Sequence, residues 1–299
     1  MSIPDPRNRD IVVFVNGELV PRASAMVSVF DSSVQGGDAV WEGLRVYNGR
    51  IAALDGHLQR LQDSAKALLF EVVPSTDEVR DAIFKTLAAN GMRDESHIRL
   101  TLTRGEKITS GMNPRLNQSG CCLIVLAEWK PPVYSDDVIR VITASTRRNT
   151  PQCLDSKIHH NNLLNNILAS IEANVAGVDS AIMLDVDGFV SETNDTNLFI
   201  VNHGEVLTPT ADSCLPGLTR QMILDICKEQ GIPVAERRLS MTEVYTADEV
   251  FTSGTMGELT PILEADGRVI GEGKPGDMTK RLQSLHREFA FEHGTPLPV

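Results

Sequence analysis

An informative segment of the sequence reads Asp155-Ser156-Lys157-Ile158-His159-His160-Asn161-Asn162-Leu163-Leu164. It places one lysine between a polar loop and the apolar spacing of a helix expected over 161–176. A lysine in such a place is usually just exposed, but one held at a domain junction can be partly desolvated and become a Schiff-base nucleophile. The adjacent His159 and His160 point in different directions and no carboxylate stands at helical spacing from them, so we expect no metal ion here.

Outside this stretch, short apolar runs flank a set of Asn-Gly and Asp-Gly pairs, which are strong hairpin signals. These pairs lie at 16–17, 48–49, 187–188 and 266–267. Between them, apolar residues recur at helical spacing over 57–70, 76–90, 161–176 and 217–230. Hairpins alternating with amphipathic helices predict an α/β (α+β) protein.

Two adjacent prolines, Pro131 and Pro132, mark a candidate domain boundary, and polar residues follow them. Such a pair is very unfavourable inside a helix or a sheet interior. We therefore expect a domain over 1–130, a stiff connector over 131–137 and a second domain over 138–299. The interface between two such domains is a common place for a small-molecule site.

Composition excludes several classes of protein. The 299 residues include 28 Lys and Arg against 40 Asp and Glu, a formal net charge of −12, and no basic stripe is evident. This argues against a nucleic-acid partner. No apolar run approaches the ~20 residues that span a bilayer, and none near the N-terminus reads as a signal peptide. Five scattered cysteines without a ligand spacing indicate neither disulfides nor zinc. We expect a cytoplasmic small-molecule enzyme without a membrane partner.

Three further stretches could carry chemistry. Glu192 follows a hairpin between apolar strands, where a paired or hydrogen-bonded carboxylate is more plausible than a solvated one. Gly217-Leu218-Thr219 opens a helix and Ser253-Gly254-Thr255 ends a strand, so both offer backbone N–H groups to a phosphate. Gly271, Gly273 and Gly276 spell G-x-G-x-x-G, but no second strand and acidic residue follow, so we interpret them as a turn. With the lysine, these stretches outline a site for a phosphorylated aldehyde cofactor.

At this point the chain resembles the class IV, or fold-type IV, pyridoxal-5′-phosphate aminotransferases, which include branched-chain and D-amino-acid aminotransferases and (R)-selective amine transaminases. The likeness runs from about Val12 to Leu285. Besides the Lys157 segment, the matching motifs are V-W-E-G-L-R at 40–45, H-L-Q-R-L at 57–61, S-E at 191–192, N-L-F at 197–199, L-P-G-L-T-R at 215–220, S-G-T at 253–255 and E-L-T-P at 258–261. The resemblance implies a small N-terminal α/β domain and a larger C-terminal α/β pseudo-barrel domain, with the cofactor between them, usually in a homodimer.

The resemblance also implies roles for individual residues. Lys157 forms the Schiff base with pyridoxal 5′-phosphate and is the catalytic residue that shuttles the proton. Glu192 keeps the pyridine nitrogen protonated, so that the ring acts as an electron sink. Arg60 pairs with the phosphate. The other cofactor-binding residues implied are Asn162, Leu218, Thr219, Gly254 and Thr255.

The sequence departs from the branched-chain pattern on the substrate side. Asn162 and Gly36 each stand where branched-chain enzymes carry a tyrosine, and Trp41 stands where a phenylalanine is expected. Loss of two aromatic rings predicts a pocket that is larger or has a different polarity. The substrate-binding set implied is Gly36, Trp41, His97, Arg99, Arg104 and Met256, in which either arginine could bind a substrate carboxylate or be an ordinary surface residue.

The resemblance therefore implies an aminotransferase that moves an amino group from an amino acid or amine to a 2-oxo acid, with branched-chain L-amino acids as the default donors. The altered pocket favours, as an alternative, a D-amino-acid or (R)-selective amine transaminase. A lyase of the aminodeoxychorismate type shares the fold, and a non-catalytic binding protein is disfavoured by the intact Lys157, Glu192 and Arg60. We expect segment 107–117 of a neighbouring subunit to close the site.

Overall fold

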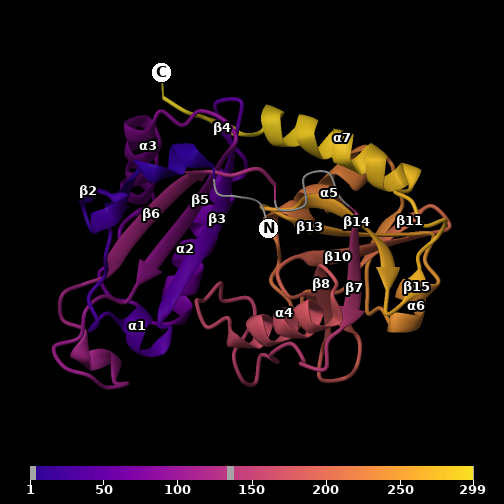
Figure 1. Cartoon of the computed structure of the whole chain (residues 1–299), viewed down its shortest axis with the longest axis horizontal. Coiled ribbons are helices and arrows are strands. Elements are labelled where there is room, and N and C mark those ends of the chain that lie inside the picture. The colour runs from indigo at the N-terminus through magenta and orange to yellow at the C-terminus, as the bar shows by residue number, and fades with distance from the viewer. Residues whose placement is uncertain (1–4, 133–137, 299) are drawn as a thin grey trace. The chain divides into compact units, whose positions relative to one another are not determined.

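The computed structural model describes residues 5–132 and 138–298, and it divides the chain into two compact units (Figure 1). The first unit contains the chain up to Pro131 together with Ile158–Asn162 and the residues from Phe291 onwards. The second contains Pro132–Lys157 and Leu163–Ala290. Two short segments that the sequence assigned to the second domain thus belong to the first unit. Of the connector expected over 131–137, residues 133–137 lie outside the described residues.

The first unit is built on a seven-stranded sheet in the order β16-β4-β3-β5-β6-β1-β2. Its long central strands are β3 (Ala39–Tyr47), β5 (Ser96–Thr103) and β6 (Cys122–Trp129). The flanking strands are β1 (Val12–Val15), β2 (Glu18–Pro21), β4 (Arg50–Ile51) and β16 (Thr295–Pro296). The helices are the short α1 (Ser32–Gly36), with α2 (Leu54–Ala67) and α3 (Thr76–Asn90), which pack on the sheet. Asn16 and Asn48 adopt positive φ angles of 48° and 46°, as tight two-residue hairpin turns require.

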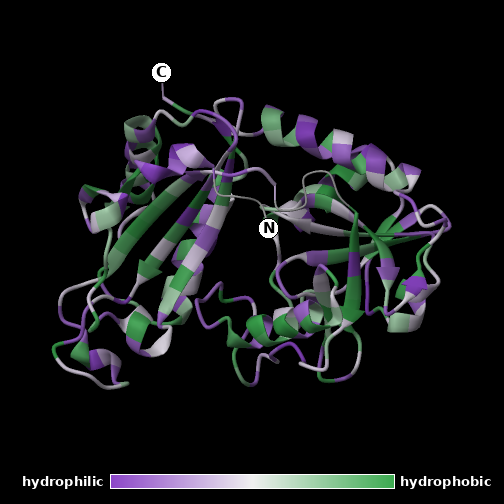
Figure 2. Ribbon diagram, viewed as in Figure 1, coloured by the Kyte–Doolittle hydropathy of each residue, from purple (hydrophilic) through white to green (hydrophobic). Residues whose placement is uncertain are grey.

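Alternation along the central strands gives this sheet two different faces. Leu44, Ile98 and Val125 lie on the apolar face, which forms one buried core with α2 and α3. The opposite face of β3 and β5 carries polar and aromatic side chains instead. Figure 2 shows the apolar residues concentrated on the strands. The sheet therefore packs one face on its helices and carries polar and aromatic side chains of β3 and β5 on the other.

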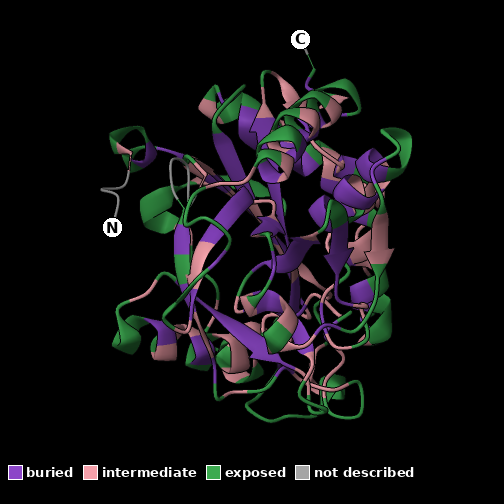
Figure 3. Cartoon of the chain, turned by 90° about the vertical axis from the view of Figure 1, so that its right-hand side faces the viewer, coloured by how far each residue is buried: buried purple, intermediate pink, exposed green. Residues whose placement is uncertain are grey.

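The second unit contains a nine-stranded sheet in the order β12-β11-β10-β13-β14-β7-β8-β9, with β15 paired to β14. The strands are β7 (Ile139–Thr143), β8 (Ser180–Leu184), β9 (Val190–Thr193), β10 (Asn197–Asn202), β11 (Glu205–Thr208), β12 (Val234–Glu236), β13 (Glu249–Gly254), β14 (Glu258–Ala265) and β15 (Arg268–Val269). The edge strand β9 contacts β10, so the sheet curls into a half-barrel. Most of its strand residues are buried (Figure 3).

Four helices complete the second unit: α4 (Leu164–Ala176), α5 (Leu218–Glu229), α6 (Met241–Tyr245) and α7 (Asp277–Glu292). A core of α5 and α7 against β10 and β13 centres on Phe199 and Phe251, whose rings stack 5.0 Å apart. Val244 of α6 belongs to a separate core with β7, β8 and β14. Small residues, Ala169 and Ala173, let α4 pack closely on β7 and β8.

All four predicted hairpins are present, and the mixed α/β class is confirmed. The helix expected over 161–176 starts later, at Leu164, because the preceding segment extends the sheet of the first unit. Trp41 N–H donates to His159 O at 2.9 Å and Asn161 N–H donates to Ala39 O at 2.8 Å. Across the described parts of the chain, none of the helices combines the length and apolar character needed to cross a membrane.

Candidate cofactor and substrate site

A buried ion pair lies at the centre of the candidate site in the second unit. Glu192 on β9 accepts a hydrogen bond from Arg148 Nε at 2.6 Å on Oε1 and one from Asn197 Nδ2 at 3.1 Å on Oε2. Burial raises the pKa of the Glu192 carboxyl, and the Arg148 guanidinium opposes that rise. Asn166 of α4 accepts from Arg148 Nη1 at 3.1 Å and so holds the arginine in place. Glu192 is therefore held directly by Arg148 and Asn197, and Asn166 in turn holds Arg148.

Sequence reasoning missed Arg148 as a site residue. It lies in the polar loop after β7, among residues whose composition is that of an ordinary surface loop. The one available signal was a pair of adjacent arginines, Arg147 and Arg148, a short distance before the candidate lysine. Only the fold brings Arg148 and Glu192 together across 44 residues of chain.

Backbone N–H groups predicted to bind phosphate come together near this ion pair. Helix α5 begins after Gly217, which offers no side chain to cap the first N–H groups. A Cβ atom at Gly217 would collide with Asn197 Oδ1, and one at Gly254 would come within 2.9 Å of Thr196 Cγ2. Asn197 also pairs with Ser253 across β10 and β13. Thr196 in the turn after β9 and Asn197 at the start of β10 thus contact the end of β13 and the start of α5. The predicted residues at these two ends are Leu218, Thr219, Gly254 and Thr255, followed by Met256 in the next turn.

Ser253 adds a second sign of a binding site. Its side chain is buried, and its Oγ has no hydrogen-bond partner within residues 5–132 and 138–298. A buried hydroxyl without a partner costs free energy unless a ligand or water satisfies it.

Lys157 lies in a turn that Asp155 stabilises. Asp155 Oδ1 accepts from the Lys157 backbone N–H at 3.0 Å and lies 3.8 Å from Nζ. The lysine side chain is 48% exposed, so the predicted desolvation is not found. The buried Cys214 thiol interacts electrostatically with both Lys157 and Glu192, and burial, ahead of these charges, raises its pKa to about 12. The lysine and the glutamate therefore belong to one region of the second unit.

A second cluster, in the first unit, surrounds Glu42 of β3. Arg60 of α2 donates to Glu42 from Nε at 2.8 Å and from Nη2 at 2.7 Å. His57 Nδ1 lies 2.6 Å and His159 Nδ1 3.1 Å from its carboxylate oxygens. Burial lowers the pKa of His159 to about 4, so this imidazole is neutral at neutral pH.

The predicted phosphate ligand Arg60 is consequently the cation that balances Glu42. Burial alone would raise the pKa of Glu42, but the hydrogen bonds from His159 and Arg60 and the charge of the Arg60 guanidinium hold it well below its usual range. The carboxylate accepts from Nε and Nη2 of Arg60 and so fixes the guanidinium in place.

The predicted substrate residues of the first unit form two groups. The Arg99 guanidinium carbon lies 3.4 Å from the centre of the Trp41 ring, and Arg99 Nη2 donates to Asn161 at 3.0 Å. Burial lowers the pKa of Arg99 to about 10. Asn162 Nδ2 donates to Gly36 O at 3.2 Å, so the two positions that lack the expected tyrosines contact each other. His97 is buried on β5.

Arg104 differs from the other candidates. It donates to both carboxylate oxygens of Asp38, at 2.6 and 3.1 Å, and to the carbonyl oxygens of Leu68 and Leu69. These partners occupy the guanidinium and tie the end of β5 to the end of α2. The arrangement argues against Arg104 as a substrate ligand.

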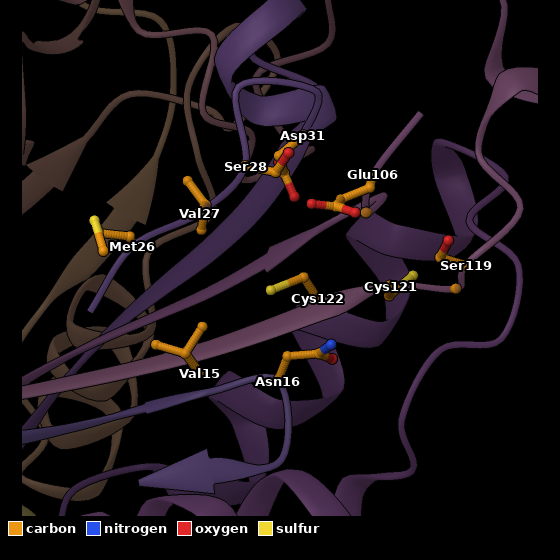
Figure 4. Close-up of a pocket in the computed structure, with 12 residues that line it drawn as sticks. Val15, Asn16, Met26, Val27, Ser28, Asp31, Glu106, Ser119, Cys121 and Cys122 are labelled. Carbon is orange, nitrogen blue, oxygen red and sulfur yellow. The ribbon is translucent and has the colours of Figure 1, made fainter. Parts of the chain in front are cut away.

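A cavity of about 210 Å³ lies elsewhere in the first unit (Figure 4). Its lining includes Asn16, Asp31, Glu106, Cys121 and Cys122. None of the predicted site residues lines it. Asp31 is already bound by Ser33 and Thr103, and burial, followed by the nearby carboxylates, raises the pKa of Cys122 to about 11. The cavity is therefore separate from the two clusters described above.

Comparison with known proteins identifies the family. The model of the amino-transferase class IV family matches residues 39–265, and the chain belongs to this family. It is 59% identical over 299 residues to "Branched-chain-amino-acid aminotransferase-like protein 2" of Arabidopsis thaliana, covering all of this chain and 54% of that protein. The chain thus spans about half the length of that curated relative.

Two other relatives match along nearly their whole length. A "Putative branched-chain-amino-acid aminotransferase" of Methanocaldococcus jannaschii is 40% identical over 283 residues, which are 94% of this chain and 97% of that protein. The crystal structure of a branched-chain aminotransferase from the thermophilic archaeon Thermoproteus uzoniensis, solved with norvaline, has a TM-score of 0.89 and 30% identity. That match covers 97% of this chain and 100% of the other. The fold-type IV architecture is confirmed.

Class IV aminotransferases depend on pyridoxal 5′-phosphate, so the predicted cofactor is confirmed for the family. The residues of this chain fit it. The glycines at 217 and 254 leave room that a Cβ would fill, the Ser253 hydroxyl lacks a partner among the described residues, and a buried carboxylate and a lysine lie in the same unit.

Proposed function

We propose that this chain is a pyridoxal-phosphate-dependent aminotransferase that transfers an amino group from an amino acid to a 2-oxo acid. The observation that carries the proposal is the buried Glu192, held by Arg148 and Asn197 beside the uncapped start of α5. An acid for the ring nitrogen and N–H donors for the phosphate are the two features this cofactor requires of its protein.

When bound, pyridoxal 5′-phosphate supplies the electron sink that makes the substrate Cα–H acidic. Glu192 would hold a proton at the pyridine nitrogen, and Arg148 keeps the carboxylate in position. The N–H groups of Leu218, Thr219, Gly254 and Thr255 would bind the phosphate, and Arg60 stays the arginine that the family resemblance implies for it. Lys157 moves the proton at the substrate Cα, and its exposed amine is accessible to substrate.

Branched-chain L-amino acids are the donors we propose, because relatives along the whole chain carry that name. An alternative donor class, D-amino acids or (R)-amines, is supported by the pocket side chains. Gly36 and Asn162 stand where tyrosines are expected, and they contact each other. Both substitutions therefore change the size and polarity of the same part of the proposed substrate pocket. We propose a cytoplasmic location, supported by five cysteines that are all free.

The visible spectrum of the cofactor-loaded protein tests the function and the donor together. Excess L-leucine should remove the visible absorbance of the bound cofactor, and a 2-oxo acid should restore it. Lys157→Ala should abolish both the band and turnover, while Lys228→Ala, a change at an exposed lysine of α5, should leave both intact. A band that L-leucine leaves unchanged but D-alanine or an (R)-arylalkylamine removes would replace the donor assignment. A wild-type protein without the band would contradict the proposal.

We further propose that the chain forms a homodimer. On α4, the apolar residues follow helical spacing on a face that is open to solvent. The exposed side chains of this α4 stripe are Leu164, Ile167, Leu168, Ile171 and Val175. In the first unit, Ile108 and Met112 are also exposed, the latter by 96%, which supports segment 107–117 as the part that closes a neighbouring site.

A further inference from the structure

Glu258, the first residue of β14, has a strained backbone conformation beside the proposed phosphate site. Gly254 pairs with Glu258 across β13 and β14, so residues 255–257 form the turn of this hairpin, which we call the site turn. Glu258 has a positive φ of 51°, in the left-handed region that residues other than glycine and asparagine rarely adopt. This strain is compensated only if the glutamate side chain makes contacts that a glycine would lose.

Within the described residues, the start of β14 has a strand neighbour on one side only. β13 pairs with β14 from Glu258 onwards, whereas β7 pairs with it only from Ile262 onwards. Helix α7 contacts the start of β14, since Gln283 Nε2 donates to Leu259 O at 2.9 Å. Leu259 and Leu282 of α7 also belong to one apolar core. The helix therefore supports the end of the strand that carries the site turn.

The Glu258 carboxylate reaches α7 as well. Its Oε2 lies 3.5 Å from Nε of Arg287, which follows Gln283 by one helical turn. Burial lowers the pKa of the adjacent His286, and the Glu258 carboxylate opposes this effect. The Glu258 side chain is 15% exposed, so it is largely enclosed between its own strand and the helix. The residue with the strained backbone thus connects the site turn to α7.

A further contact fixes the last residue of the site turn. Thr260 Oγ1 donates to Gly257 O at 2.8 Å, and both residues are buried. Gly257 directly precedes Glu258, so the turn is held from β14 at the point where the strain lies. The other two residues of the turn are Thr255 and Met256, which the family resemblance assigns to the phosphate and to the substrate. Any movement of Glu258 would therefore be transmitted to residues of the proposed site.

We propose that Glu258 is a positioning residue for the cofactor and substrate site. Its left-handed backbone sets the direction in which the site turn leaves β14, and its carboxylate beside Arg287 keeps that direction fixed. The inference rests on the proposed function for the identity of the ligand, but not for the rigidity of the turn. In this arrangement α7 supports the site through Gln283 and Arg287.

Amide hydrogen exchange of the site turn, followed by mass spectrometry, tests the positioning without requiring turnover. Glu258→Asn introduces a residue that tolerates the left-handed conformation but has a shorter side chain. Exchange in the site turn should become about tenfold faster in this variant, with or without cofactor. Arg287→Met should accelerate exchange only about threefold, because an ion pair with a 67% exposed arginine is weak. Glu258→Gln keeps the length of the side chain and should retain part of the protection.

Arg281→Met is the matched control, because it removes an exposed arginine from the same helix. It should leave exchange in the site turn unchanged. Unchanged exchange in Glu258→Asn would overturn the proposal.

Thermal unfolding and cofactor affinity separate positioning from general stability. Relief of the strain should leave the melting temperature of Glu258→Asn unchanged or raise it, while the dissociation constant of pyridoxal 5′-phosphate rises about tenfold. A residue that serves only general stability would instead lower the melting temperature, and that result would overturn the proposal. An unchanged dissociation constant would overturn it as well. Faster exchange in the Glu258→Asn turn, in a protein whose wild type binds no cofactor, would contradict the proposed function and not the positioning of the turn.

Discussion

Glu192 and Arg148 are each 7% exposed, so each charge depends on the other in a region where water does not compensate for loss of a partner. Removing one member of such a pair leaves the other as an uncompensated buried charge, whereas removing both leaves no buried charge. Burial raises the pKa of the Glu192 carboxyl, and the charge and hydrogen bond of Arg148 oppose that rise.

We therefore expect Arg148→Met to lower the free energy of unfolding by about 3–5 kcal/mol. The double variant Arg148→Met/Glu192→Gln should recover most of that loss in stability but not the rate of amino transfer, because the acid for the ring nitrogen is gone. Urea unfolding and single-turnover rates of the two variants measure this. If both variants lose the same stability, the two residues are not coupled.

His97 contributes to the pH dependence of stability, and its contribution makes the folded protein less stable as the pH falls. Its pKa is about 3 in the folded chain, mainly through burial, against an ordinary 6.5. Between these values the unfolded chain binds a proton that the folded chain does not, so stability falls as the pH falls from 6.5 towards 3.

Replacement by phenylalanine removes this contribution. In His97→Phe, the fall in unfolding free energy between pH 6 and pH 4 should be smaller than in the wild type by about 1.4 kcal/mol per pH unit. Urea unfolding at a series of pH values measures both slopes. Identical slopes would mean that His97 is protonated in the folded protein.

Among the elements, α5 begins at a residue, Gly217, that matters both for packing against Asn197 and for the proposed phosphate site. Gly217 has an ordinary extended conformation, so its need for glycine comes from the close approach to Asn197 and not from its backbone angles. Asn197 in turn donates to Glu192 and to Leu215 O. A side chain at 217 would therefore disturb both the phosphate-binding helix start and the carboxylate.

Gly217→Ala should weaken binding of pyridoxal 5′-phosphate at least tenfold through displacement of Asn197. Gln221→Ala changes an exposed residue one turn further along α5 and should leave the affinity unchanged. Equilibrium titration of the apoprotein with the cofactor, followed by its absorbance, compares the two. Equal affinities would show that the helix start adjusts without cost.

The hairpins and helices could be predicted from sequence because their signals are local. Asn-Gly and Asp-Gly pairs specify turns, and glycines such as Gly91 and Gly177 end helices. The start of α4 could not, because His159 and Asn161 use their backbone groups in a bridge to β3, a contact distant in sequence. Arg148 was missed for the same reason, because its partner Glu192 lies 44 residues further along the chain.

For the molecule as a whole, the notable feature of α4 is that its larger apolar side chains lie on the face exposed to solvent, which is unfavourable in a monomer. The small Ala169 and Ala173 face the sheet, while Ile171 and Val175 are 49% and 85% exposed. Water contact with this many aliphatic groups is unfavourable by about 25 cal/mol for each Å² that association could bury. A second copy of the chain is the partner we propose for this stripe, because most soluble oligomers are symmetric assemblies of identical chains.

The double variant Leu168→Lys/Ile171→Lys tests the homodimer. It should sediment as a monomer, where we expect the wild type to sediment as a dimer, because two charges cannot be buried in an apolar contact without large cost. Ala176→Lys/Gln230→Lys adds the same two charges at exposed positions outside the stripe and serves as the control. If the stripe forms the dimer, the stripe variant should also lose turnover while it keeps its secondary structure, since segment 107–117 could no longer reach a neighbouring site. A stripe variant that remains dimeric would place the subunit contact on another face, and Met112→Lys in that segment would then be the variant to examine.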